Sequence, residues 1–508
     1  MSASAAEPSR TPRTDAYFCE RPADPCAIVM FGASGDLAKR KLLPALYDLA
    51  IHSCLAPRFK LLGFARTEMS DDQFRKEASE FLPAGDGAQR EEFMQHLHYF
   101  RGNYDDAESY KGLAQRLEEL NRTGNLGGNR LFYLATPPNI YPKVVEQLGQ
   151  AGLVKPATNG SWSRIIIEKP FGRDGVSARD LNRKVLQVFE ESQVYRIDHY
   201  LGKETVQNLL VFRFGNGIFE PLWNRNYVDY VQITAAEQLG VEQRAAFYES
   251  AGALRDMIQS HVLQLASLVA MEAPAAFDAT AVRNEKLKVL QSIRPLQPGT
   301  VEKLVVRGQY GPGSIDGKDV PGYRGEPGVN PNSATETFVA LKLYVDNWRW
   351  SGVPFYLRSG KRLERAVTEI AIGFKRAPHM VFQGDDGEQN SLILNIQPDE
   401  GISLTFGAKS PGGKMQISPV KMDFKYRQAF GSGSREAYAT LINDCVRGEA
   451  TLFDRADSVE AAWALVDPIL EAWQNGAAPK FPNYAAGSEG PQAAIELAEA
   501  DGRHWRPL

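Results

Sequence analysis

The sequence predicts an α/β plus α+β fold: an N-terminal, Rossmann-like, doubly wound domain followed by a larger domain with a mostly antiparallel sheet and helices. In the first third of the chain, short apolar runs alternate with helical patterns, which is typical of βα units around a parallel sheet. After about Tyr200, apolar and polar residues alternate, which indicates antiparallel strands solvated on one face. We expect a dinucleotide-binding domain at 26–199 and a β+α substrate and oligomerisation domain at 200–508.

The elements of the first domain follow from short apolar runs. The run at 27–31 is too short for a helix and predicts a strand that ends at Gly32. A leucine-rich helical pattern follows at 39–51, and Pro44 should kink or restart that helix. Another helix should begin at Ser177, with Asp180 as its capping-box partner. Further strands are predicted at 60–65, 131–135 and 165–167.

The second domain shows strand patterns first and helical patterns last. We predict strands at 230–235, 337–345, 368–374, 392–396 and 402–406, and helices at 252–272, 435–446 and 458–473. The stretch at 306–333 is rich in Gly and Pro, has no clear period, and is expected to form a long loop.

Composition excludes several classes of function. The 508 residues include 58 Lys plus Arg and 62 Asp plus Glu, so the net charge is −4 and no basic excess indicates nucleic acid or an anionic membrane. No apolar run approaches the roughly 18 residues of a membrane span. Residues 1–25 contain four prolines and no apolar signal core, and we expect a disordered tail. These observations predict a cytoplasmic protein with a small ligand.

The cysteines Cys19, Cys26, Cys54 and Cys445 are scattered and form no CxxC pair. This spacing argues against a zinc site and against a disulfide framework. A reducing compartment fits this pattern.

A glycine-containing turn joins the first strand to the first helix, at Gly32-Ala33-Ser34-Gly35-Asp36-Leu37. Bare backbone N–H groups and a helix N-terminus can face a pyrophosphate there. Ser34 and Leu37 stand where GxGxxG has glycines, so a tight turn without a ligand is the alternative. The second strand runs into Arg66, where an arginine suits a 2′-phosphate, which favours NADP over NAD; an ordinary surface arginine is the alternative.

Lys169 lies at the carboxyl end of a buried strand, where open α/β sheets bind ligands. Pro170 excludes a helical conformation at Lys169 and could be cis, which would fix the direction of the lysine. A lysine that merely extends its head to solvent is the alternative.

The segment at 196–204 has the highest density of ionisable and hydrogen-bonding side chains, with Asp198, His199, Tyr200 and Lys203 inside six positions. The last three can together hold a phosphate, while Asp198 can orient another group. A solvated loop is the alternative.

His261 lies on a predicted apolar helix, where a lone histidine is more often a core residue than a catalyst. It becomes a base only with a carboxylate partner. Asp256 is five residues away, about 140° around an α-helix, so Asp198 is the better candidate.

Four blocks together, at 32–38, 168–172, 196–204 and 255–261, strongly resemble glucose-6-phosphate dehydrogenase, and the match extends over roughly 26–473. The resemblance implies oxidation of β-D-glucose 6-phosphate by NADP⁺ to 6-phosphogluconolactone, the first step of the oxidative pentose phosphate pathway. It also implies one NADP per subunit, no metal, a homo-dimer or homo-tetramer and the bacterial branch of the family.

The resemblance also implies residue roles. His261 falls on the general base and Asp198 on the carboxylate that orients it. Phosphate binding falls on His199, Tyr200 and Lys203, sugar contacts on Glu237 and Asp256, and Lys169 serves both substrate and nicotinamide. Lys361 matches a lysine near the substrate, and Arg365 ends a loop that is one residue shorter than in relatives. The cofactor contacts fall on Gly32, Ala33, Ser34, Gly35, Asp36, Leu37, Arg66 and Lys169.

Two other functions compete with this one. A sugar oxidoreductase of the glucose-fructose oxidoreductase type also joins a Rossmann domain to a sheet and carries a Glu-Lys-Pro motif, but it would use unphosphorylated sugar. A catalytically silent NADP-binding protein would keep the fold without turnover. His199, Tyr200 and Lys203 argue against the first, and the acid and base argue against the second.

Overall fold

The computed structural model describes residues 19, 21–155, 160–379, 389–412, 415–431, 435–476 and 479–508. Its first sheet has six parallel strands in the order β3-β2-β1-β4-β5-β6. This order is that of a doubly wound Rossmann sheet, so the predicted fold class is confirmed. The strands are β1 (Ala27–Phe31), β2 (Lys60–Ala65), β3 (Leu97–Arg101), β4 (Arg130–Leu134), β5 (Ser163–Ile167) and β6 (Val194–Arg196).

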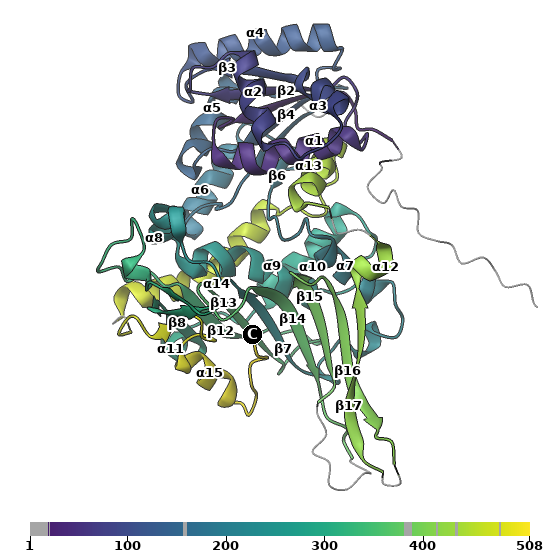
Figure 1. The fold of residues 1–508 in the computed structure, drawn as a ribbon, viewed down its shortest axis with the longest axis vertical. Helices are drawn as coiled ribbons and strands as arrows, with labels where there is room; N and C mark the ends of the chain where they lie inside the picture. The colour runs from purple at the N-terminus through teal and green to yellow at the C-terminus, as the bar shows by residue number, and fades with distance from the viewer. Residues whose placement is uncertain are drawn as a thin grey trace, which may run out of the picture.

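Helices cover both faces of this sheet, as Figure 1 shows in its upper part. Because both faces are covered, β1 and β4 are buried along their whole length, which explains their continuous apolar runs. The helices are η1 (Ala38–Leu42, a π-helix), α1 (Leu43–Ile51), α2 (Asp71–Phe81), α3 (Gly87–Met94), α4 (Ala107–Gly124), α5 (Tyr141–Gln150) and α6 (Gly175–Leu186).

The second sheet has eight strands in the order β17-β16-β15-β14-β7-β13-β12-β8. All neighbours are antiparallel except β7 and β13, which run parallel, so their carboxyl ends meet at one edge. The strands are β7 (Val228–Ala236), β8 (Val305–Gly308), β12 (Phe338–Tyr344), β13 (Pro354–Gly360), β14 (Val367–Phe374), β15 (Ser391–Gln397), β16 (Gly401–Lys409) and β17 (Ile417–Lys425).

The helices of the second domain lie mainly between its sheet and the first domain (Figure 1). They are α7 (Glu204–Phe214), α8 (Ala245–Ala253), η6 (Leu254–Val262, a π-helix), α9 (Leu263–Ala270), α10 (Ala279–Ser292), α11 (Pro298–Leu304), α12 (Tyr426–Phe430), α13 (Ala437–Arg447), α14 (Ala456–Asn475) and α15 (Gln492–Glu499). A large apolar core runs from the first sheet through α14, η6 and α9 to the second sheet.

Three local predictions need correction. Helix α6 begins at Gly175 rather than Ser177, because Asp174 is its N-cap and accepts the backbone N–H of Ser177 at 2.8 Å. The predicted helix at 252–272 is broken at its start, where Gly252 has φ +67°, and continues as η6 and α9. The predicted loop at 306–333 contains β9 (Tyr310–Gly311), β10 (Gly313–Ile315) and β11 (Lys318–Val320), strands too short to give a periodic signal.

Pro44 behaves as expected. The π-helix η1 ends just before it, and α1 restarts with Pro44 in its first turn, where the missing N–H costs nothing.

Helix α13 comes from the C-terminal half of the chain but packs on the first domain. Leu441, Ile442 and Cys445 are buried in the same core as Leu46 and Leu49 of α1. Lys41 and Glu436 form an ion pair of 2.9 Å across this contact. The two predicted domains are therefore joined by more than one chain connection.

The cysteine prediction is wrong for one pair. Cys19 and Cys54 form a disulfide, while Cys26 and Cys445 are free and buried. The two paired cysteines are separated by 35 residues and carry no spacing signature. Residues 1–18 and 20 lie outside the described part, so most of the predicted disordered tail is not described.

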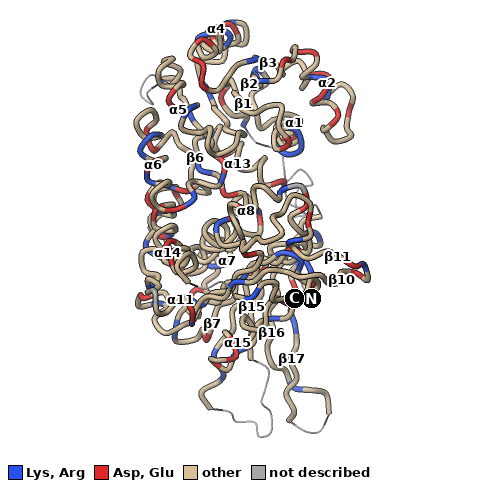
Figure 2. Tube along the Cα trace, turned by 90° about the vertical axis from the view of Figure 1, so that its left-hand side faces the viewer, with Lys and Arg blue, Asp and Glu red and all other residues tan. Residues whose placement is uncertain are grey.

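Charged residues of both signs are spread over both domains (Figure 2). Within the described residues, every helix is too short or too polar to cross a membrane.

Candidate active site

The turn after β1 approaches β4 closely. Gly32 has φ +84°, and a Cβ there would lie 2.4 Å from the carbonyl oxygen of Ala135. Only glycine fits this position, which also lies where the strand order reverses between β1 and β4. Gly35 donates its N–H to Gly32 at 2.9 Å and closes the turn before η1. The geometry thus suits the close approach of a dinucleotide phosphate to the backbone.

Several polar groups lie together at one edge of this turn, and they suit the 2′-phosphate of a dinucleotide. Arg66 is exposed at the end of β2, with its guanidinium 5.7 Å from the ring centroid of Tyr104. Thr67 donates its hydroxyl to that of Ser34 at 3.1 Å. Thr67 and Tyr104 were missed by the sequence analysis, because no motif marks them.

The remaining residues of the turn have structural contacts. Ala33 is buried against Gly63, Leu37 packs on the core under α1, and Asp36 pairs with Arg40 of the next helical turn at 2.5 Å.

A histidine and an aspartate from different elements are hydrogen-bonded to each other. Asp198 follows β6, His261 comes from η6, and His261 Nδ1 lies 2.5 Å from Asp198 Oδ1. The same oxygen accepts the backbone N–H of Tyr200 at 2.9 Å. Both side chains are buried, with 2% of Asp198 and 1% of His261 exposed. This contact joins residues that are 63 positions apart in the sequence.

Lys169 caps the other nitrogen of this histidine. Its Nζ lies 2.6 Å from His261 Nε2, and it also donates to the Asp256 backbone oxygen at 2.9 Å and to Asp256 Oδ1 at 3.1 Å. The Lys169–Pro170 peptide is cis, as the sequence analysis allowed. Because an ammonium can only donate, Nε2 is an acceptor and the imidazole proton lies on Nδ1, facing Asp198.

The pKa shifts agree with this assignment. Burial and the nearby Lys169 charge hold the pKa of His261 well below its usual value, so the ring is neutral. Burial raises the pKa of Asp198. Although burial opposes it, the charges of Lys169 and Arg244 lower the pKa of Asp256, which stays ionised. The site therefore holds a neutral imidazole between a carboxylate and an ammonium.

The choice of Asp198 over Asp256 as the partner of His261 is confirmed, but the angle assumed between Asp256 and His261 is changed by the π-helix. In η6 the hydrogen bonds join residues five apart, so Asp256 and His261 share one face. Both consequently reach Lys169, although the carboxylate bonded to His261 is that of Asp198. The 140° separation holds only for an α-helix.

Three residues from the loop before α7, His199, Tyr200 and Lys203, form the phosphate wall of the candidate site. The Tyr200 ring stacks on His261 with centroids 4.2 Å apart, and the His199 ring lies 4.4 Å from the His261 ring at 74°. Lys203 is the N-cap residue of α7 and hydrogen-bonds Gln397 at the end of β15. Burial lowers the pKa values of His199 and Lys203. An imidazole, a phenol, an ammonium and a helix N-terminus thus converge, which suits an anion.

Glu237 and Lys361 meet at the edge where β7 and β13 end side by side. Lys361 Nζ lies 2.5 Å from Glu237 Oε2, and the lysine is almost fully buried. Arg365 is exposed in the loop between β13 and β14, and within the described chain it forms no ion pair with Glu237.

A cavity of about 770 Å³ opens beside Lys169 and Asp256 and is lined from both domains. Lys169, Pro170 and Asp256 reach it from the site, and Phe247 and Gln259 come from the helices above. His261 does not itself line this space but is connected to it through Lys169, which bonds its Nε2.

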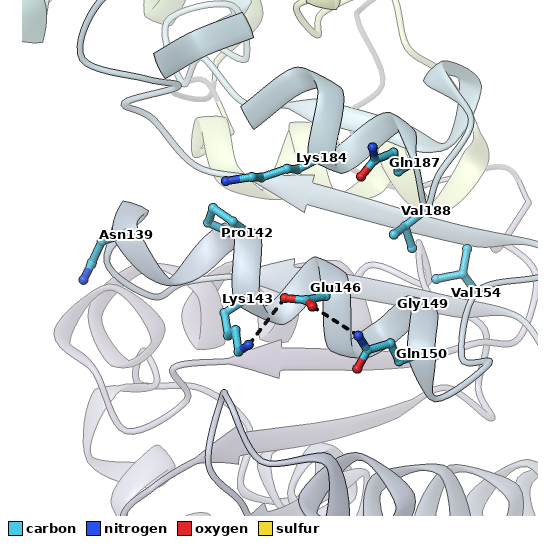
Figure 3. A pocket seen from close by; sticks show the side chains of 10 residues that line it. All are labelled: Asn139, Pro142, Lys143, Glu146, Gly149, Gln150, Val154, Lys184, Gln187 and Val188. Atoms are coloured by element: carbon cyan, nitrogen blue, oxygen red, sulfur yellow. Dashed lines mark hydrogen bonds and ion pairs between the residues drawn. The ribbon is translucent and has the colours of Figure 1, made fainter. Parts of the chain in front are cut away.

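Another groove, of about 980 Å³, lies on the outer face of the first domain between α5 and α6 (Figure 3). Lys143 and Gln150 point toward Glu146 there and bond to it, and Lys184 pairs with Asp180. None of the predicted site residues lines this groove. Its charges are already paired, so we place the active site at the first cavity.

Asp198, His199 and His261 also bring oxygen and nitrogen donors within 4.8 Å of one another. Such donors suit Zn²⁺ and similar ions. However, Asp198 and Lys169 already engage the two nitrogens of His261. The arrangement fits a hydrogen-bonded base better than a metal centre.

Two family models match the chain. "Glucose-6-phosphate dehydrogenase, NAD binding domain" matches residues 29–208, and "Glucose-6-phosphate dehydrogenase, C-terminal domain" matches 210–506. The glucose-6-phosphate 1-dehydrogenase of Aggregatibacter actinomycetemcomitans is 50% identical over 487 residues, which are 95% of this chain and 98% of the relative. That of Chlamydia pneumoniae is 48% identical over 500 residues, 96% of this chain and 97% of the relative.

Solved structures agree. A glucose-6-phosphate dehydrogenase in complex with its substrate glucose 6-phosphate superposes with a TM-score of 0.88 at 35% identity, and covers 96% of this chain and 100% of its own. The glucose-6-phosphate 1-dehydrogenase of Mycobacterium avium gives a TM-score of 0.82 at 33% identity, with 96% and 99% covered.

Proposed function

The chain belongs to the glucose-6-phosphate dehydrogenase family, and we propose that it oxidises the C1 hydroxyl of β-D-glucose 6-phosphate to 6-phosphogluconolactone with NADP⁺. The observation that carries this proposal is the buried Asp198–His261 pair, which is bonded to the cavity-lining Lys169 and lies next to His199, Tyr200 and Lys203. We further propose one NADP per subunit, a cytoplasmic location and a homo-dimer or homo-tetramer, on the family resemblance.

The cofactor would lie along the turn after β1. The pyrophosphate would bind at Ser34, Gly35 and Asp36, where the turn leads into η1, and Lys169 would stand at the nicotinamide end. When bound, NADP⁺ accepts the hydride from C1. The chain's own contribution is to hold and orient both partners.

His261 takes the proton in this proposal. Its Nε2 carries the lone pair that accepts from Lys169 Nζ, and the C1 hydroxyl would take the place of Lys169 on that nitrogen. The imidazolium that forms is stabilised by the Asp198 carboxylate on Nδ1. Lys169 keeps its second anchor on Asp256 and stays beside the reacting atoms. Glu237 and Lys361 extend the polar lining to the sugar.

His199, Tyr200 and Lys203 would bind the phosphate. Because the phosphate lies away from C1, its binding mainly orients the sugar against the base. This wall also favours glucose 6-phosphate over the unphosphorylated sugar of the glucose-fructose oxidoreductase alternative.

The first experiment adds glucose 6-phosphate and NADP⁺ to the purified protein and follows NADPH absorbance. We expect steady NADPH formation, and much less with glucose. Equal rates with glucose would favour the alternative sugar oxidoreductase, and no NADPH at all would favour a silent NADP-binding protein.

Replacing Lys203 with alanine should raise KM for glucose 6-phosphate by roughly 10- to 100-fold, since a charge-assisted hydrogen bond is worth about 1.5–3 kcal/mol. KM for NADP⁺ should change little. Lys184→Ala, in the outer groove, is the matched control. An unchanged KM in Lys203→Ala would remove this lysine from the phosphate site.

Replacing Arg66 with alanine should lower the preference for NADP⁺ over NAD⁺ by about 10-fold or more, because the 2′-phosphate loses its charged partner. The ratio of kcat/KM for the two cofactors measures this. Arg101→Ala serves as a control, since Arg101 ends the neighbouring strand β3 but pairs with Glu68. A ratio equal to that of the unaltered protein would assign cofactor choice to other residues.

A further inference from the structure

Glu168 is a buried carboxyl group that the proposed mechanism leaves unused. It follows β5 and lies on the same face as Ile166, which pairs with Tyr133 of β4. Tyr133 donates its hydroxyl to Glu168 Oε1 at 2.5 Å. Only 7% of Glu168 and 1% of Tyr133 are exposed.

Within the described chain, Glu168 forms no ion pair. A buried carboxyl without a cation is costly, and such groups are more often found at functional sites than in ordinary cores. Its next residue in the chain is Lys169, which caps the base. Glu168 is therefore the chain neighbour of the lysine that bonds the proposed base.

The charges around Glu168 come from each element packed against it. Tyr133 faces it from β4, Tyr141 from α5 and Tyr438 from α13, while Lys169 and Asp198 are its charged neighbours. The Tyr133 phenol is hydrogen-bonded to it, the other two phenols and the Lys169 ammonium act on it electrostatically, and Asp198 opposes its negative charge.

We propose that Glu168 is a positioning residue whose ionised form, stabilised by Tyr133, strengthens the Asp198–His261 pair as the base takes its proton. This inference rests on the proposed function, because it concerns the same reaction. A second carboxylate near the pair favours the imidazolium that forms at His261. Glu168 itself touches neither the substrate nor the reacting atoms in this proposal.

The ionisation of Glu168 falls in a pH range in which it can change the rate of the reaction. Burial raises the pKa of Glu168 to about 7, against the opposing hydrogen bond from Tyr133 and the charge of Lys169. His261 is neutral well below that pH, since burial lowers its pKa. The rate should therefore rise through about pH 7 as Glu168 loses its proton, separately from the titration of the base.

The test compares kcat/KM against pH for four proteins. Unaltered enzyme should gain roughly three- to ten-fold across pH 6–8, the effect of half to one pKa unit on a base. Glu168→Gln should lose this rise and match the unaltered enzyme only at the acid end. Tyr133→Phe should move the rise to higher pH, because the carboxylate loses its donor. Asp444→Asn should keep the rise unchanged.

Asp444 is the matched control because burial also raises its pKa to about 7, but it lies on α13 away from the base. Persistence of the rise in Glu168→Gln overturns the proposal, and its loss in Asp444→Asn assigns it elsewhere.

A second readout needs no turnover. Protonated-carboxyl absorption in the infrared should be lost between pH 6 and 8. One component of this loss should be missing from Glu168→Gln, and a different one from Asp444→Asn, whose carboxyl has a similar pKa. If the band titrates but the enzyme makes no NADPH at any pH, the proposed function and this role fall together. If the enzyme is active and Glu168→Gln keeps the whole titrating band and the pH rise, only the role of Glu168 falls.

Discussion

We expect His261→Asn to lower kcat by about two to four orders of magnitude, the usual contribution of a positioned general base. Asparagine has no group that can accept the C1 proton near neutral pH. Binding of glucose 6-phosphate should persist, since the phosphate wall is unchanged. Stopped-flow or steady-state NADPH absorbance gives kcat, and equilibrium binding of the sugar phosphate gives its affinity.

The side chain of His261 is buried, so a folding defect must be separated from a chemical one. Circular dichroism and the unfolding midpoint of His261→Asn should therefore be compared with those of the unaltered protein. His504→Asn is the matched control, because His504 is exposed and remote, with its nearest acid, Glu499, at 3.6 Å. A well-folded His261→Asn that keeps its kcat would remove the base from position 261.

Asp198→Asn should lower kcat by about two orders of magnitude with little change in KM. Asp198 Oδ1 accepts both His261 Nδ1–H and the Tyr200 backbone N–H. An asparagine oxygen can replace it there, so the tautomer of His261 is kept. What is lost is the negative charge that stabilises the imidazolium. The new amide nitrogen would also occupy the position of Asp198 Oδ2, which is buried and has no hydrogen-bond partner.

The double variant separates a shared role from two independent ones. If Asp198 acts only through His261, Asp198→Asn should add almost nothing to His261→Asn, because residues that act as a unit are not additive. Losses that multiply would show that Asp198 supports catalysis by another route.

The sequence predicted the fold class and the strands of the first domain well, because short apolar runs between turns determine buried parallel strands. The predicted strand at 60–65 coincides with β2. The sequence also indicated the importance of Gly32, which ends the first strand. The structure supplies the reason, because the close approach of its backbone to Ala135 excludes any side chain.

What remained hidden depends on contacts between distant segments or on unusual local geometry. The π-helix η6 has no periodic signature that a period of 3.6 residues would detect, so the face shared by Asp256 and His261 was missed. Gln397 hydrogen-bonds Lys203 although the two residues are 194 positions apart, and no local sequence pattern predicts this contact. The Cys19–Cys54 bond was missed because its spacing matches no known framework.

The docking of α13 on α1 has a consequence during synthesis. Chains emerge from the ribosome N-terminus first, and domains usually fold as they appear. Here the part of the α1 surface that packs on α13 stays uncovered until Leu441 and Ile442 have been made, by which time most of the second domain also exists. The nascent nucleotide-binding half therefore carries an open hydrophobic patch for much of translation, a natural target for a ribosome-associated chaperone.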